Sequence, residues 1–306
     1  MFKPKYADNI LRPSLRGRER QIRPQHESNE DRQAPATFGR WSAIGHIAGR
    51  QVRRSLSGWP FYGAAVIALA VVIGLLYCTV WFAGEAGLYV LSRPSVLPMQ
   101  VVTTAGCLFV LFGAALSHVP SRRRVMRRPD WSAGGDRPTL VAARFLAWVV
   151  VYGLLLLILI PLLALLTRGT NLFIPPALLW SLIPSLVCAG LAVSVGLFIA
   201  AAAPTREAAV AIAAAVVVTS LALQSSHLVL ASLPPANPYQ AILPLLRAGQ
   251  KLLPYVSPFA ASDAMLDAAL RSDLPAFLRL MLVTLLNVAL WLGAAWMTLR
   301  RRNKLP

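Results

Sequence analysis

The sequence is poor in the residues that form disulfide frameworks and metal sites. It contains only three cysteines and four histidines. Cys78, Cys107 and Cys188 all lie inside apolar runs, with no C-x-x-C pair and no histidine at a metal-ligand spacing. The histidines are scattered along the chain. We therefore expect neither a disulfide framework nor a bound metal.

The sequence also lacks the motifs of common enzyme active sites. It has no H-E-x-x-H, no G-x-S-x-G and no acidic pair at one depth of an apolar segment. It has no G-x-x-x-x-G-K-S/T loop either, so the chain cannot bind ATP through a P-loop by itself. We expect no enzyme activity, no catalytic residue and no cofactor in this chain.

Charged residues are scarce, at 14% of the chain against about 25% in ordinary soluble domains, while 57% of the residues are hydrophobic. This composition indicates a membrane protein. The net charge of +18 alone would suit nucleic acid as a partner. The basic residues are concentrated in a few segments between long apolar runs, however, and this position argues against nucleic acid. The first apolar run begins near residue 60, too late for a cleavable signal peptide, so we expect it to remain as an anchor.

Six segments are long and apolar enough to cross a bilayer core, which takes roughly 20 helical residues. None of the six carries a charge at its centre, whereas a proton-driven or sodium-driven transporter usually has ionisable groups at mid-membrane. The sequence thus predicts an all-α polytopic membrane protein with six transmembrane helices. The predicted spans are residues 60–82, 98–116, 145–166, 177–203, 208–230 and 277–299.

The distribution of basic residues predicts the orientation of these spans. Most of the 30 lysines and arginines precede the first span, follow the last one, or lie in the connections after the second and fourth spans. By the positive-inside rule these segments, and both termini, are cytoplasmic. The expected location is the bacterial cytoplasmic (inner) membrane.

The chain before the first span divides into two parts. Residues 1–37 have no apolar periodicity and are predicted to form a disordered basic cytoplasmic tail. Residues 38–58 place Trp41, Ile44, Ile47 or Ala48, and Val52 at helical spacing, with basic residues on the other side. We expect an amphipathic helix on the inner membrane surface, facing anionic lipids. Its basic residues are Arg50, Arg53 and Arg54.

Two features near the fifth span leave alternatives open. Residues 233–275 are apolar but broken by prolines, and Ser257 followed by Pro258 is a helix start. We expect short re-entrant helices in the outer leaflet, with a plain surface loop as the alternative. The span itself ends in a polar cluster that either lines a polar pathway or makes hydrogen bonds between helices. The cluster contains Gln224, Ser225, Ser226 and His227.

Three stretches along this plan match one known family in their order. They are GHIAGRQVRRSLSGWPFYGAAV before and into the first span, AAAAPTREAAVAIAAAVVV around Pro204, and YVSPFAASDAML with Ser257, Pro258 and Phe259. With six spans and a basic loop after the second, residues 38 to 302 resemble the permease (transmembrane) subunit of type-2 ATP-binding-cassette (ABC) exporters. The first stretch is similar to the family's elbow helix.

The resemblance implies a pair of partner P-loop ATPase subunits, which hold ATP and Mg and contact the permease at cytoplasmic loops. The coupling loop would be residues 119–144, and the turn between the fourth and fifth spans would contribute as well. The loop departs from the family pattern in its RRRVMRR stretch, which favours an acidic groove on the ATPase or added contact with inner-leaflet lipids. The implied coupling residues are Arg122, Arg123, Arg124, Val125, Met126, Arg127, Arg128, Asp130, Trp131, Thr205, Arg206 and Glu207.

Six spans are half of the family's usual transport unit, so the resemblance also implies a second permease subunit, either another copy or a related chain. The expected substrate is an amphiphile: a lipid, drug or peptide. A non-transporting membrane scaffold or anchoring subunit of a larger envelope complex is the main alternative. An ATP-independent carrier and a membrane enzyme of another kind are less favoured.

The orientation can be tested at Ser132, in the arginine-rich loop after the second span. Because the positive-inside rule places this loop in the cytoplasm, we expect Ser132→Cys to react with a membrane-impermeant thiol reagent only from the cytoplasmic side. Labelling is measured in intact cells and in inverted vesicles. Labelling from outside in intact cells would contradict the topology.

Overall fold

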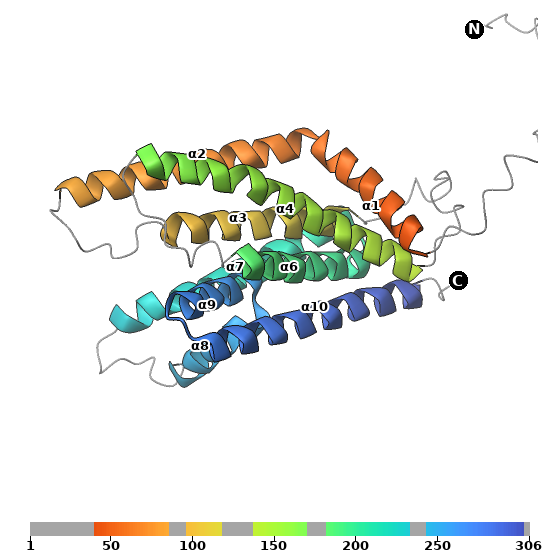
Figure 1. Cartoon of the computed structure of the whole chain (residues 1–306). Helices are drawn as coiled ribbons and strands as arrows, with labels where there is room; N and C mark the ends of the chain where they lie inside the picture. Colours follow the sequence, from red (N-terminus) through yellow and green to blue (C-terminus); the bar gives the residue numbers. More distant parts are fainter. Residues whose placement is uncertain (1–39, 86–95, 118–136, 170–181, 233–242, 303–306) are drawn as a thin grey trace, which may run out of the picture. The chain divides into compact units, whose positions relative to one another are not determined.

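The computed structural model describes residues 40–85, 96–117, 137–169, 182–232 and 243–302 of the 306 (Figure 1). In these ranges every regular element is an α-helix. The helices are α1 (Arg40–Leu56), α2 (Trp59–Glu85), α3 (Val96–Leu116), α4 (Arg137–Gly169), α6 (Leu182–Ala202), α7 (Arg206–Ser232), α8 (Leu243–Val256), α9 (Pro258–Leu270) and α10 (Leu274–Arg302).

Four of the described helices are long and apolar enough to cross a membrane, as a helical membrane protein requires. The qualifying segments are Pro138–Ile158, Leu182–Ala202, Arg206–Ser226 and Leu274–Arg301. Shorter apolar segments, Trp59–Val71 and Gln100–Leu116, lie in α2 and α3. Each of the six predicted spans overlaps a described helix, although residues 177–181 of the fourth span lie outside the described residues. Only four of the helices meet the length criterion within the described residues, so the count of six stays a prediction.

The start of α4 differs from its predicted span. The helix begins at Arg137, whereas the span was placed from residue 145. Pro138 lies in the first turn, where its missing N–H costs nothing because the first amides of a helix have no internal acceptor. Arg137 and Arg144 are therefore helical, and the coupling loop predicted for residues 119–144 is shorter at its end by the residues that belong to α4.

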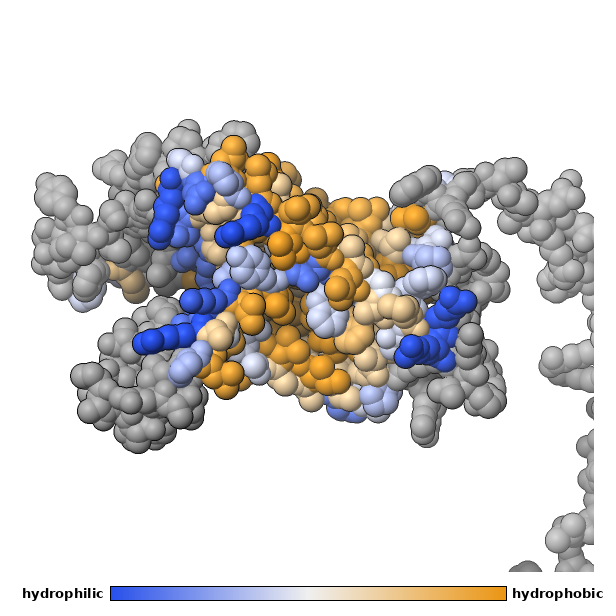
Figure 2. Space-filling model, turned by 90° about the horizontal axis from the view of Figure 1, so that it is seen from below, coloured by the Kyte–Doolittle hydropathy of each residue, from blue (hydrophilic) through white to orange (hydrophobic). Residues whose placement is uncertain are grey.

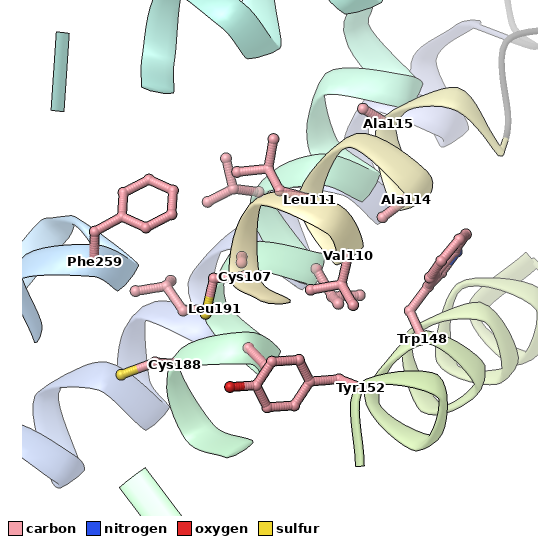
Figure 3. Packing of buried hydrophobic residues seen from close by; sticks show 14 of the residues in the cluster. Cys107, Val110, Leu111, Ala114, Ala115, Trp148, Tyr152, Cys188, Leu191 and Phe259 are labelled. Carbon is pink, nitrogen blue, oxygen red and sulfur yellow. The ribbon is translucent and has the colours of Figure 1, made fainter. Parts of the chain in front are cut away.

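Helix α6 lies at the centre of the packing. It contacts α3, α4, α7, α9 and α10. Its residues from Cys188 to Leu197 are all buried, and many are small. Because α6 is apolar on every side, neighbouring helices can cover it all round. Figure 3 shows part of this core, with Cys188 and Leu191 beside residues of α3, α4 and α9.

Two glycines of α3 make room for two aromatic rings of α4. A Cβ on Gly106 would lie 2.6 Å from Cε2 of Tyr152, and one on Gly113 would lie 2.2 Å from Cη2 of Trp148. Gly106, the earlier glycine of α3, faces Tyr152, the later ring of α4, and Gly113 faces the earlier ring, Trp148. The two helices are therefore antiparallel. Both rings are largely buried (Figure 3). The register between α3 and α4 follows from these two ring-against-backbone contacts.

The contact between α3 and α6 is closer still, because it brings backbone against backbone. A Cβ on Gly196 would lie 2.5 Å from the carbonyl oxygen of Leu111 and 2.9 Å from the Cβ of Ala114. Unlike the end of a flexible side chain, a backbone carbonyl cannot turn aside. Any larger residue at position 196 would have to push the two helices apart.

We expect Gly196→Ala to destabilise the protein by about 1–3 kcal/mol through overpacking. Gly293 of α10 is a matched control, because nothing lies within 4 Å of a Cβ placed there. Gly293→Ala should be neutral or stabilise by up to about 1 kcal/mol, since alanine is the better helix former. The measurement is thermal unfolding of both purified variants, and equal midpoints would contradict the close α3–α6 contact.

Helix α1 packs along the first part of α4. Ile44, Ile47, Ala48 and Val52 contact the pair formed by Ala143 and Ala147. The apolar stripe that the sequence predicts is therefore confirmed for these four residues. Its partner in the structure is another helix, and its position at the membrane surface stays a prediction.

Short helices are present between the fifth and sixth predicted spans, namely α8 and α9. Their re-entrant position in the outer leaflet stays a prediction. Pro258 occupies the first turn of α9, and Ser257 takes the N-cap position in an extended conformation, as the sequence predicts. The Ser257 side chain makes no capping hydrogen bond. Most of α9 is buried, so this segment belongs to the bundle rather than to a surface loop.

On the face of the bundle seen in Figure 2, apolar side chains lie between two hydrophilic ends. Val218 of α7 is 65% exposed, and Leu282 and Leu290 of α10 are 60% and 62% exposed. A continuous apolar surface of this kind suits contact with lipid chains or with other membrane helices.

Candidate functional site

The helix ends next to the arginine-rich parts of the sequence lie together at one end of the bundle. A small cavity is lined by Leu140, Val141 and Arg144 of α4, Leu197 of α6, and Ala295 and Leu299 of α10. The start of α4 therefore lies beside the ends of α6 and α10. The contact of Gly196 with Leu111 places the end of α3 at the same level.

We call this part of the molecule the basic end. It comprises the end of α3, the start of α4, the α6–α7 turn with Arg206, and the end of α10 with Arg300 and Arg301 (Figure 1). Ser117 and Arg137, the described residues that flank residues 118–136, both lie at this end. The coupling residues predicted in this segment therefore lie outside the described residues. They are Arg122, Arg123, Arg124, Val125, Met126, Arg127, Arg128, Asp130 and Trp131.

The α6–α7 turn is short and internally bonded. Only Ala203 to Thr205 separate the two helices. The Thr205 hydroxyl accepts a hydrogen bond from the Ala208 amide at 3.2 Å, as an N-cap does. Glu207 lies in the first turn of α7, where a negative charge interacts favourably with the helix dipole.

Thr205, Arg206 and Glu207 are all exposed, while Ala203 is buried. The turn thus exposes one positive side chain, Arg206, and one negative side chain, Glu207. The two packed helices on either side hold its backbone in place. A partner can reach these two charges without any rearrangement of the bundle, and the coupling role that the resemblance implies for Thr205, Arg206 and Glu207 stays a prediction.

The basic residues of α1 point away from its packed stripe. Arg50, Arg53 and Arg54 are exposed. The Trp41 side chain lies outside the described part of the helix. Arg144 differs from these arginines, because it is half-buried in the small cavity among the aliphatic side chains of α4, α6 and α10.

The polar cluster at the end of α7 binds two different helices. The Gln224 Nε2 donates a hydrogen bond to Oδ2 of Asp263 on α9. The Gln250 Nε2 on α8 donates to the Ser226 hydroxyl at 2.8 Å. Ser225 is exposed and bonds the carbonyl of Ala222, while the His227 side chain lies outside the described residues. For Gln224 and Ser226 the geometry favours hydrogen bonding between helices over a polar pathway.

Asp263 and Gln250 were missed by the sequence analysis, and no local signal distinguishes them. Asp267, one turn after Asp263, is the same residue type on the same helix. Yet Asp267 is exposed and forms a 2.9 Å ion pair with Arg271, whereas Asp263 is half-buried. The packing of α9 against its neighbouring helices, with the hydrogen bond from Gln224 of α7, separates their roles.

Asp263 is electrostatically unusual. Burial raises the pKa of its carboxyl from 3.8 to about 6, against the hydrogen bond from Gln224, which lowers it. Its second oxygen, Oδ1, is buried and accepts no hydrogen bond from the described residues. The carboxyl is thus poised to change its charge near pH 6, at the junction of α7 and α9.

Comparison with models of known protein families and with curated protein sequences finds no match to this chain.

We expect the stability of the protein to fall as the pH rises through about 6. Because the folded-state pKa of Asp263 is raised, its contribution is fully present below pH 3.8 and is lost above pH 6. Asp263→Asn keeps an acceptor for Gln224 and should flatten this dependence. The measurement is the unfolding midpoint from pH 4 to pH 8.

Asp267→Asn is the control, since that exposed side chain faces solvent and Arg271. It should leave the slope near pH 6 in place. An unchanged slope in Asp263→Asn would show that another group causes the dependence.

Proposed function

We propose that this chain is the membrane-spanning permease subunit of an ATP-driven transporter of the ABC exporter type, coupled to a separate ATPase subunit. The observation that best supports the proposal is the convergence at the basic end of the α6–α7 turn and the two helix ends that flank residues 118–136. These are the two connections that the sequence resemblance assigns to the ATPase.

In this proposal the basic end faces the cytoplasm and six helices cross the inner membrane, namely α2, α3, α4, α6, α7 and α10. The placement of Arg300 and Arg301 beside the start of α4 agrees with an even number of crossings. The excess of basic residues at this end is what the positive-inside rule requires.

The mechanism follows from rigid packing. The partner ATPase binds ATP and Mg and closes, and its surface moves the α6–α7 turn together with the connection before α4, residues 119–136. Since α6 is packed against α3, α4 and α10, a push on its end is transmitted to the bundle as a rigid body. The spans then tilt and change access to the substrate path.

A second permease subunit would cover the exposed side of α7. Val210, Ile212 and Val218 on that helix are 40%, 41% and 65% exposed, beside many alanines. Small side chains such as these alanines let two membrane helices approach closely. The substrate path would lie between the two subunits.

The described surface suits an apolar cargo. A groove of about 250 Å³ between α2, α3 and α4 has an entirely apolar lining that includes Ile67, Phe109, Phe112 and Leu155. A lipid, drug or peptide with an apolar part fits such a surface better than a small ion does, because an ion would need polar groups to replace its water.

The α6–α7 turn provides the test of this function. We expect a P-loop ATPase to co-purify with the chain from its native host, and the chain alone to hydrolyse no ATP. The charge swap Arg206→Glu/Glu207→Arg should reduce the recovered ATPase by about tenfold, a change of about 1.4 kcal/mol. Both side chains are exposed, so the fold should be unaffected.

The control is the swap Asp267→Arg/Arg271→Asp, which exchanges an exposed ion pair far from the basic end. It should leave ATPase recovery unchanged. If envelope proteins co-purify with the chain and no P-loop ATPase does, the transporter proposal is contradicted and the scaffold alternative is supported.

A further inference from the structure

Helix α8 has one side held by the bundle. A Cβ on Gly249 would lie 3.3 Å from Cδ2 of Leu223 on α7, and the Gln250 amide bonds the Ser226 hydroxyl at 2.8 Å. The two contacts are adjacent along α8 and one turn apart along α7. They determine which side of α8 faces the protein and which sides are left open.

A second side of α8 is apolar and exposed. Leu245, Leu252 and Val256 are spaced by seven and four residues, which places them on one stripe of a helix. Their exposed fractions are 73%, 63% and 58%. No described part of the protein covers this stripe.

A third side of α8 is basic. Arg247 and Lys251 are exposed and lie one turn apart. Neither forms an ion pair with an acidic side chain of the described residues. Like charges at this spacing repel each other within a helix, so the pair does not serve the stability of α8 itself.

The depth of α8 follows from its contact with α7. Ser226 lies 20 residues beyond Arg206 in the same helix, which is roughly 30 Å at 1.5 Å per residue. This length equals about the thickness of the hydrocarbon core. If Arg206 marks one boundary of the membrane, α8 lies near the opposite one. Figure 2 shows hydrophilic residues gathered at that end of the molecule, where α8 and the start of α10 lie.

We propose that α8 is a lipid-binding helix whose Arg247 and Lys251 hold the phosphates of anionic phospholipids, while Leu245, Leu252 and Val256 contact the acyl chains. An exposed apolar stripe and a separate basic face on one helix, at the boundary of the hydrocarbon, match the two parts of a phospholipid. An acidic protein segment would satisfy the two charges but would leave the stripe uncovered. The inference requires only that α7 crosses a membrane and does not depend on transport.

The test places a reporter between the two charges. Ala248 is exposed, so Ala248→Cys in a Cys78→Ala background can carry a fluorophore, while Cys107 and Cys188 are buried. The full chain is reconstituted in phosphatidylcholine nanodiscs that contain a few per cent of lipid with a quencher on the headgroup. One sample uses quencher-labelled phosphatidylglycerol, and the other uses quencher-labelled phosphatidylcholine.

We expect stronger quenching by phosphatidylglycerol, because two basic residues near a surface enrich anionic lipid by roughly 30-fold. Arg247→Gln/Lys251→Gln should abolish the difference, and so should 0.5 M salt applied to the unchanged charge pair. Arg247→Lys/Lys251→Arg should retain it. Arg300→Gln/Arg301→Gln removes the same charge at the basic end and should retain it as well.

Equal quenching by the two lipids with Arg247 and Lys251 in place would overturn the proposal and favour an acidic protein partner. Persistence of the difference in the double glutamine variant would overturn it too, because the enrichment would then come from other residues. The salt series on the unchanged charge pair gives the same decision if the double variant fails to fold.

Discussion

The close approach of α3 to α4 and α6 is the contact on which the rest of the bundle depends. Gly196 brings two backbones together, and Gly106 and Gly113 admit the rings of Tyr152 and Trp148. These contacts determine how far each helix slides along its neighbour, since a shift by one turn would place a ring against a side chain. The register in turn decides which helix ends lie side by side.

The basic end is a consequence of that register. Residues far apart in the sequence, from the start of α4 to the end of α10, line one small cavity there. The α6–α7 turn beside them is capped by Thr205 and exposes Arg206 and Glu207. A rigid bundle with a charged, short and well-anchored turn can pass a push from a partner to its interior, whereas a long loop would absorb it. This physical property underlies the proposed coupling to an ATPase.

The opposite end is held together by polar side chains. Gln224 bonds Asp263 and Gln250 bonds Ser226, so α7 binds both short helices through amide groups in a mostly apolar setting. Such hydrogen bonds are directional, and they orient α8 so that its basic and apolar sides face outward. The two ends of the protein thus carry positive charge for different reasons: one beside a capped turn that suits a protein, the other beside an exposed apolar stripe that suits lipid.

The sequence alone determined the helical class, the positions of the long apolar helices, the stripe of α1 and the start of α9 at Pro258, because hydrophobic period, length and turn chemistry are local properties. It did not reveal that the stripe of α1 packs on Ala143 and Ala147, or that Asp263 differs from Asp267. These features were decided by tertiary structure. The burial of a carboxyl, and the partner of an apolar side chain, depend on which helices approach each other, and that approach is set by contacts such as Gly196 against Leu111, between residues distant in the chain.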